Sequence, residues 1–164
     1  MIILGIDPGT ATTGYGIIEK PKGQKSKGKS SSLRCVGYGC ITTSKEKNSG
    51  ERLWILEKGI QKLIQKHSPD VMAVESIFFF KNLKTAMPVS QAKGVILLVA
   101  AKRKIPTYEF SPLQVKMTVA GYGRADKTQI QKMVKEILGL EKIPKPDDAA
   151  DALSVALTCS YFLR

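Results

Sequence analysis

The chain has 164 residues, the size of one ordinary domain, and we expect a single domain over residues 1–164. A hydrophobic content of 43% excludes intrinsic disorder, and no apolar run approaches the roughly 20 residues that span a bilayer. A formal net charge of +12 and a pI near 9.7 favour a polyanionic partner. Three irregularly spaced cysteines indicate neither a disulfide framework nor a zinc site, and the N-terminus lacks signal-peptide features, so we expect a cytoplasmic protein.

The N-terminal part of the chain reads as three β-strands in quick succession. IILGID, GYGIIEK and RCVGYGCITT are short runs rich in apolar and β-branched residues, and together they predict an antiparallel meander. The stretch near residues 20–33, between the second and third strands, is rich in Lys, Gly and Ser and has no apolar periodicity. We interpret it as a mobile basic loop, either a solvated hairpin extension or a DNA contact.

A helix and a buried strand follow. Leucine and isoleucine recur at helical spacing over residues 49–70 and predict an amphipathic helix. The next run, VMAVES, is continuously apolar and predicts a strand that lies parallel to its partner through a right-handed crossover. If that partner is the first strand, Asp7 and Glu75 emerge at the same end of adjacent parallel strands. That end is where ligands bind in open α/β sheets.

The remaining segments predict one strand and four helices. The helix expected over about residues 84–104 is apolar nearly all round, which places it in the core or against another subunit. IPTYEF predicts the fifth strand, and SPLQVKMTVAG predicts the next helix. In the helix after that, Asp126 is the expected N-cap with Gln129 as its capping-box partner. Pro146 and Asp147 open the last helix, and we interpret Asp147 as its cap.

Two further acids on the last helix raise the question of catalysis. Asp148 and Asp151 are three residues apart, so they project from one face of the helix. Asp151 stands among small and apolar residues that indicate a packed face, where a carboxylate needs a partner. No Lys or Arg between residues 146 and 163 supplies one. Two structural roles remain as alternatives to catalysis. Asp7 begins the sequence Asp-Pro-Gly and could stabilise a turn, and Glu75 could form a salt bridge.

A cluster of Asp7, Glu75, Asp148 and Asp151 would be unfavourable unless cations neutralised it, because like charges at short range raise one another's pKa. Hard oxygen ligands without a His or Cys cluster favour Mg²⁺ or Mn²⁺ over zinc. Two such ions about 4 Å apart can activate a water and stabilise the leaving oxygen of a phosphodiester. Combined with the basic net charge, this pattern predicts a nuclease.

Five stretches of the chain resemble one protein family. GIDPGTATTGYGII, VESIFFFKN, QAKGVILLVAA, QVKMTVAGYGRADKTQIQKMV and DDAADALSVAL are together similar to the bacterial crossover junction endodeoxyribonuclease RuvC, the Holliday junction resolvase. The resemblance covers almost the whole chain and omits only the loop near residues 20–33. It implies a ribonuclease H-like α/β fold, with a five-stranded mixed sheet flanked by helices on both faces, and a homodimer.

The resemblance also implies roles for particular residues. The four acids fall on the family's metal-binding catalytic carboxylates: Asp7, Glu75, Asp148 and Asp151. Lys116 and Lys127 match basic residues associated with the DNA strand and the active site, and Arg124 extends the same basic track. Without the resemblance, the lysines read as a solvated helix face.

An aromatic contact with DNA is implied as well. Phe78 falls where the family carries an aromatic side chain that stacks on an unpaired base at the junction, an interaction that tolerates any base. Because Phe79 and Phe80 follow directly, the sequence leaves open which of the three contacts DNA and which is buried.

The implied reaction is hydrolysis of phosphodiester bonds with two Mg²⁺ ions per site, or Mn²⁺ in their place, which leaves 5′-phosphates. A homodimer has two equivalent sites and would place one nick in each of two strands of like polarity in a four-way DNA junction. Branch-migration proteins of the same recombination and repair pathway are the other implied partners, and no membrane is involved.

Other classes of protein remain open from the residues themselves. Actin-like ATPases and sugar kinases also carry an Asp-x-Gly-Thr pattern after a first strand, although they enclose the nucleotide between two lobes. A non-catalytic DNA-binding module would keep the lysines without needing four acids. A ribonuclease H or a transposase-like enzyme shares the carboxylate chemistry.

Overall fold

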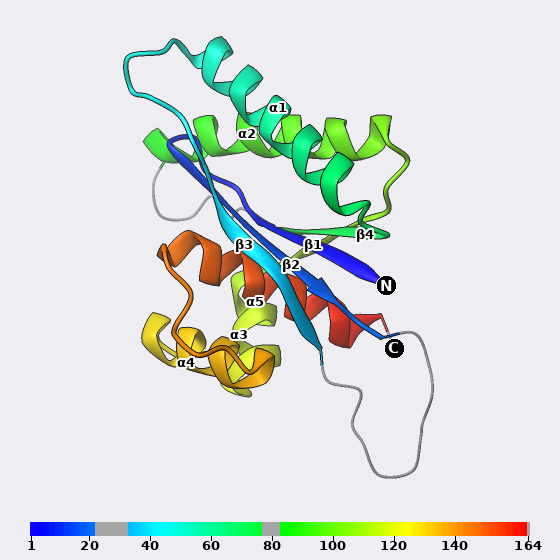
Figure 1. Cartoon of the computed structure of the whole chain (residues 1–164). Helices are drawn as coiled ribbons and strands as arrows, with labels where there is room; N and C mark the ends of the chain where they lie inside the picture. The colour runs from blue at the N-terminus through cyan, green and yellow to red at the C-terminus, as the bar shows by residue number, and fades with distance from the viewer. Residues whose placement is uncertain (22–32, 77–82, 164) are drawn as a thin grey trace.

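A computed structural model describes residues 1–21, 33–76 and 83–163, in which one five-stranded sheet lies between two layers of helices (Figure 1). The strands, which stand in the order β3-β2-β1-β4-β5, are β1 (Ile2–Asp7), β2 (Thr12–Glu19), β3 (Arg34–Thr42), β4 (Val71–Glu75) and β5 (Thr107–Phe110). The helices are α1 (Ser49–His67), α2 (Leu83–Lys102), α3 (Pro112–Ala120), α4 (Lys127–Leu138) and α5 (Asp147–Phe162). The basic loop expected near residues 20–33 lies largely outside the described residues.

The strand pairing sets the edge of the sheet at which the acids emerge. β1, β2 and β3 pair antiparallel, which confirms the predicted meander. β1 pairs parallel with β4, with Ile6 opposite Val74, and β4 pairs parallel with β5. Asp7 and Glu75 are the next residues after Ile6 and Val74, so they leave the sheet side by side at the carboxyl end of the two strands. The predicted parallel pairing of β4 is confirmed, and its partners are β1 and β5.

Each face of the sheet is covered by its own group of helices. Helices α1 and α2 cover one face, and α3, α4 and α5 lie on the other (Figure 1). On the first face, Ile60 of α1 and Ile96 of α2 are fully buried, while on the second Leu153 and Leu157 of α5 are. Burying these side chains stabilises the fold by about 1.5–3 kcal/mol each. The second core packs α5, which carries two of the four acids, against the sheet.

Side-chain caps begin three of the helices. Asn48 caps α1 and Ser111 caps α3, each with a reciprocal capping box. Asp126 accepts from the backbone of Gln129 at the start of α4, as predicted, and Gly139 ends that helix in the left-handed conformation. Because each cap satisfies backbone groups that would otherwise be unpaired, the helix begins at a defined residue. The Asp126 cap therefore fixes the position of Lys127, the first residue of α4.

The start of α5 differs from the prediction. The N-cap residue is Pro146, which provides no side-chain hydrogen bond, and Asp147 is already the first helical residue. The interpretation of Asp147 as a cap is therefore wrong. Its carboxylate instead accepts from Lys145 Nζ at 2.7 Å, because a lysine two residues earlier reaches it.

Helix α2 is only half covered. Ala92, Ile96 and Val99 are buried against the sheet and α1, while Met87 and Leu98 keep 65% and 53% of their surface exposed. One side of this helix therefore belongs to the core, and the other presents apolar side chains to solvent. None of the described helices has the length and apolar character needed to cross a membrane.

Candidate active site

The structure brings the four predicted carboxylates together at the carboxyl edge of β1 and β4. Asp7 ends β1, Glu75 ends β4, and Asp148 and Asp151 lie on the first turns of α5. Burial raises the pKa of Asp7 well above its ordinary value, and the negative charges of the other three carboxylates raise it further. Acids from three separate elements therefore act on one another electrostatically.

Two other members of the cluster are also perturbed. The pKa of Glu75 is raised by burial and by the charge of Asp151, and a hydrogen bond with Asp7 offsets part of the increase. The pKa of Asp151 is raised by burial, while its hydrogen bond with Lys127 lowers it in part. Titratable groups perturbed both by burial and by specific charged neighbours are typical of functional sites. The cluster has the electrostatics of a site that attracts positive charge.

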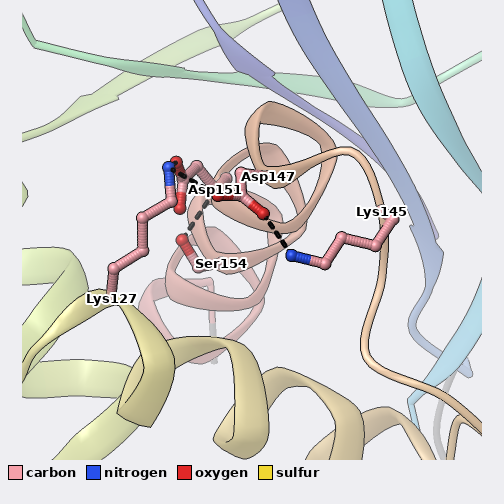
Figure 2. A network of polar contacts seen from close by, with 5 residues as sticks. All are labelled: Lys127, Lys145, Asp147, Asp151 and Ser154. Carbon is pink, nitrogen blue, oxygen red and sulfur yellow. Dashed lines mark hydrogen bonds and ion pairs between the residues drawn. The ribbon is translucent and has the colours of Figure 1, made fainter.

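Lys127 is the positively charged partner of Asp151. Lys127 Nζ lies 3.0 Å from Asp151 Oδ2 and 3.7 Å from Asp147 Oδ2 (Figure 2). Burial lowers the pKa of Lys127, but the hydrogen bond and charge of Asp151 outweigh this effect and raise it overall. The partner therefore comes from the start of α4, and the sequence around Asp151 gave no indication of it.

A pocket of about 200 Å³ opens beside these groups. Its lining joins the acids to two of the predicted DNA-contacting lysines: Glu75, Pro112, Val115, Lys116, Lys127, Ile130, Asp151 and Ser154. Arg124 is exposed in the connection that leads to α4 and is not part of this lining. Phe78, with Phe79 and Phe80, lies outside the described residues. The structure thus places Lys116 and Lys127 in the pocket with two of the acids and leaves Arg124 outside it.

Glycines let α5 approach the sheet closely enough to deliver its acids. A Cβ atom on Gly14 would lie 1.9 Å from the carbonyl oxygen of Asp148, and one on Gly5 would lie 2.2 Å from that of Ala152. Such distances are far below van der Waals contact, so only glycine fits at these positions. Sequence analysis did not identify this role. Glycine inside a strand, as in TGYGII, is the signal that could have shown a close backbone approach.

Cys40 is a further neighbour of the cluster that sequence analysis did not identify. Its thiol lies partly buried on β3, and burial together with the charges of Asp148 and Asp7 raises its pKa to about 11. The spacing of the three cysteines carried no hint of this location, because it depends on the pairing of β3 with β2. Cys40 therefore reports the negative charge of the carboxylates.

The donor chemistry of the cluster fits a hard divalent cation. The acids offer carboxylate oxygens, which Mg²⁺ and Mn²⁺ prefer, and their mutual repulsion is relieved by added positive charge. Within residues 1–21, 33–76 and 83–163, no three acidic, cysteine or histidine side chains already form a ligand set for one ion. The ammonium of Lys127 stands at Asp151 instead.

Comparison with known proteins shows what this chain is similar to. Residues 3–159 match the family described as crossover junction endodeoxyribonuclease RuvC. The RuvC of Natranaerobius thermophilus is 52% identical over 164 residues, which is all of this chain and 97% of that protein. The RuvC of Desulfitobacterium hafniense is 53% identical over 157 residues, 96% of this chain and 90% of that protein.

A solved structure agrees in both sequence and fold. The structure described as T. thermophilus RuvC in complex with Holliday junction substrate has a TM-score of 0.89 at 33% identity, over 100% of this chain and 95% of that one. This match confirms the ribonuclease H-like fold and favours a nuclease over the nucleotide-binding classes that share the Asp-x-Gly-Thr pattern. Nucleases of this kind are metal-dependent. The chain belongs to the RuvC family of crossover junction endodeoxyribonucleases.

Proposed function

We propose that this chain is a structure-selective endodeoxyribonuclease that resolves four-way DNA junctions in recombination and repair. It makes paired symmetric nicks through metal-dependent hydrolysis of phosphodiester bonds and leaves 5′-phosphates. The observation that carries the proposal is the gathering of four acids and one lysine at one edge of the sheet, in a member of the RuvC family. The Thermus thermophilus RuvC complex with a Holliday junction substrate supports the choice of DNA.

The four carboxylates are the proposed metal ligands: Asp7, Glu75, Asp148 and Asp151. The proposed cofactor is Mg²⁺, with two ions in each active site and Mn²⁺ as a substitute. The absence of histidine from the cluster and the hardness of carboxylate oxygens support this assignment. Bound divalent ions supply an activated water and neutralise the departing 3′ oxygen.

The protein's own residues prepare the site and hold the DNA strand. Burial of Asp7 and Glu75 keeps solvent from screening their charges. Lys116 and Lys127 line the same pocket, which supports their assignment to a phosphate of the DNA strand, and exposed Arg124 is proposed as a further phosphate contact. Phe78 is the proposed residue that stacks on an unpaired base, an assignment that rests on the family resemblance.

The proposed enzyme acts as a homodimer. The apolar side of α2, with Met87 and Leu98 exposed and open space around Gly94, supports this helix as the contact between protomers. An isologous dimer has two equivalent sites, as paired symmetric nicks require. We place the protein in the cytoplasm, with the branch-migration proteins of the same pathway as partners by family resemblance.

The test uses a synthetic four-way junction and a matching linear duplex, end-labelled strand by strand, in Mg²⁺, in Ca²⁺ and in EDTA. Paired nicks at symmetric positions, on the junction alone and only with Mg²⁺, are expected. Equal cutting of the linear duplex would show a less selective nuclease. Junction binding without cuts in any metal ion would show a binding module and refute the proposed activity.

A further inference from the structure

Asp147 is an acid beside the cluster whose contacts are unlike those of a helix cap. Its Oδ1 accepts from Lys145 Nζ at 2.7 Å, and its Oδ2 lies 3.7 Å from Lys127 Nζ (Figure 2). Lysines from two segments of the chain therefore contact the two oxygens of Asp147.

Lys127 is shared between this fixed acid and the cluster. Its ammonium is 3.0 Å from Asp151 and 3.7 Å from Asp147, and half of the side chain is exposed to solvent. A lysine ammonium is a point charge on a flexible stem with three rotatable donors. A small movement of this stem is enough to transfer the ammonium from Asp151 to Asp147.

An ammonium and a divalent cation compete for the same oxygen of Asp151. An ammonium at 3.0 Å takes up a lone pair of Asp151 Oδ2 and repels a divalent cation at that oxygen. For Asp151 to bind a metal ion through Oδ2, Lys127 must move away from it. Release into solvent would give up the charge-assisted hydrogen bond entirely, whereas Asp147 offers an ionised acceptor close by.

We propose that Asp147 is a positioning residue that receives the ammonium of Lys127 when a divalent cation occupies Asp151. This inference rests on the proposed metal site. The lysine serves as a counter-ion for the metal-free cluster and stays at the rim of the pocket once the cation is bound. Lys145 donates to Oδ1 of Asp147 and leaves Oδ2 facing Lys127.

If Asp147 acts only through its negative charge, a different experimental result is expected. An acid in the first turn complements the helix dipole, and its negative charge attracts any nearby cation. Both of these effects act whether or not Lys127 is present. The proposed exchange requires Lys127, so a double-mutant cycle separates the two explanations.

The experiment measures Mn²⁺ binding to the metal-free full chain by titration calorimetry, without DNA. The variants are Asp147→Asn, Lys127→Met and the two combined. Asp147→Asn is expected to weaken Mn²⁺ binding about tenfold when Lys127 is present, and by less than about twofold when Met replaces it. An equal loss in both backgrounds would overturn the exchange and leave only a charge effect. Glu141→Gln, which removes an exposed acid in the connection between α4 and α5, is the matched control and should change the affinity little.

A second readout follows the lysine itself. In ¹⁵N spectra of lysine ammonium groups recorded during a Mg²⁺ titration, the Lys127 signal should persist in the wild-type chain and broaden by solvent exchange in Asp147→Asn. Persistence in both proteins would contradict the proposed acceptor. If the wild-type chain bound no Mn²⁺ at all, the metal site would fail along with this inference. Normal wild-type binding with no coupling between the two residues would refute the inference alone.

Discussion

A methyl group in place of a hydrogen on Gly14 would lie 1.9 Å from the carbonyl oxygen of Asp148. Gly14 pairs with Asp7 across the β1–β2 ladder, and Asp148 begins the acidic face of α5. The same short distance that brings the helix backbone onto the sheet therefore also brings Asp148 next to Asp7. The geometry of the cluster depends on the absence of one side chain.

The first prediction concerns this close approach. Gly14→Ala should push α5 away from the sheet, destabilise the protein by about 1–3 kcal/mol and lower the cleavage rate by about 100-fold, because the acids lose their alignment. Urea unfolding and single-turnover cleavage measure the two effects. Gly37→Ala is the control, since nothing lies within 4 Å of a Cβ there. Wild-type cleavage by Gly14→Ala would show that α5 can shift without disturbing the site.

The second prediction concerns the stability of the metal-free protein. Because the pKa of Asp7 is raised in the folded state, its ionised form opposes folding at neutral pH. Asp7→Asn should therefore stabilise the protein at pH 7 in EDTA by about 1 kcal/mol, equivalent to about 2–4 °C in Tm. The gain should disappear below the ordinary pKa of 3.8, where the carboxyl is protonated in both folded and unfolded states. A lower Tm for the variant at pH 7 would contradict the repulsion.

The third prediction uses Cys40 as a probe of the same charges. With its pKa raised to about 11, Cys40 should react slowly with iodoacetamide at pH 8, because the thiolate is the nucleophile. Asp7→Asn removes one of the causes of the increase and should accelerate the reaction. Peptide mapping by mass spectrometry follows Cys40 separately from Cys35. An unchanged rate at Cys40 would place its thiol beyond the influence of Asp7.

The fourth prediction concerns DNA contacts. Lys116→Ala should weaken junction binding and reduce the slope of log K against log salt by about one unit, as expected for one lost phosphate contact. Fluorescence anisotropy at several salt concentrations gives the slope. Lys62→Ala, on the exposed side of α1 and the opposite face of the sheet, is the control. A slope that falls equally in both variants would show only the effect of net charge.

Local sequence signals predicted the elements well, because each is contained within a few residues. The capping box of Asp126 and Gln129 is one example, and the apolar run of β4 is another. The crossover predicted a parallel partner for β4 without identifying it, and the observed pairing with β1 places Asp7 beside Glu75.

The contacts between helices could not be predicted in the same way. The ion pair between Lys127 and Asp151 depends on how α4 packs against α5, and no local pattern encodes this packing. The prediction of Asp147 as a cap is wrong for a local reason, because Pro146 is the N-cap residue and the carboxylate accepts from Lys145. The close approach of α5 to the strand glycines likewise exists only in the folded sheet.

The most direct test of the metal-dependent active site compares single-turnover junction cleavage and junction binding by carboxamide variants of the four acids: Asp7→Asn, Glu75→Gln, Asp148→Asn and Asp151→Asn. Each should lose cleavage by at least about 100-fold in Mg²⁺ yet bind the junction as the wild type does. Glu141→Gln, which changes the charge equally outside the cluster, should cut normally. Near wild-type cleavage by any one of the four would remove that acid from the site, and cleavage by all four would refute the account.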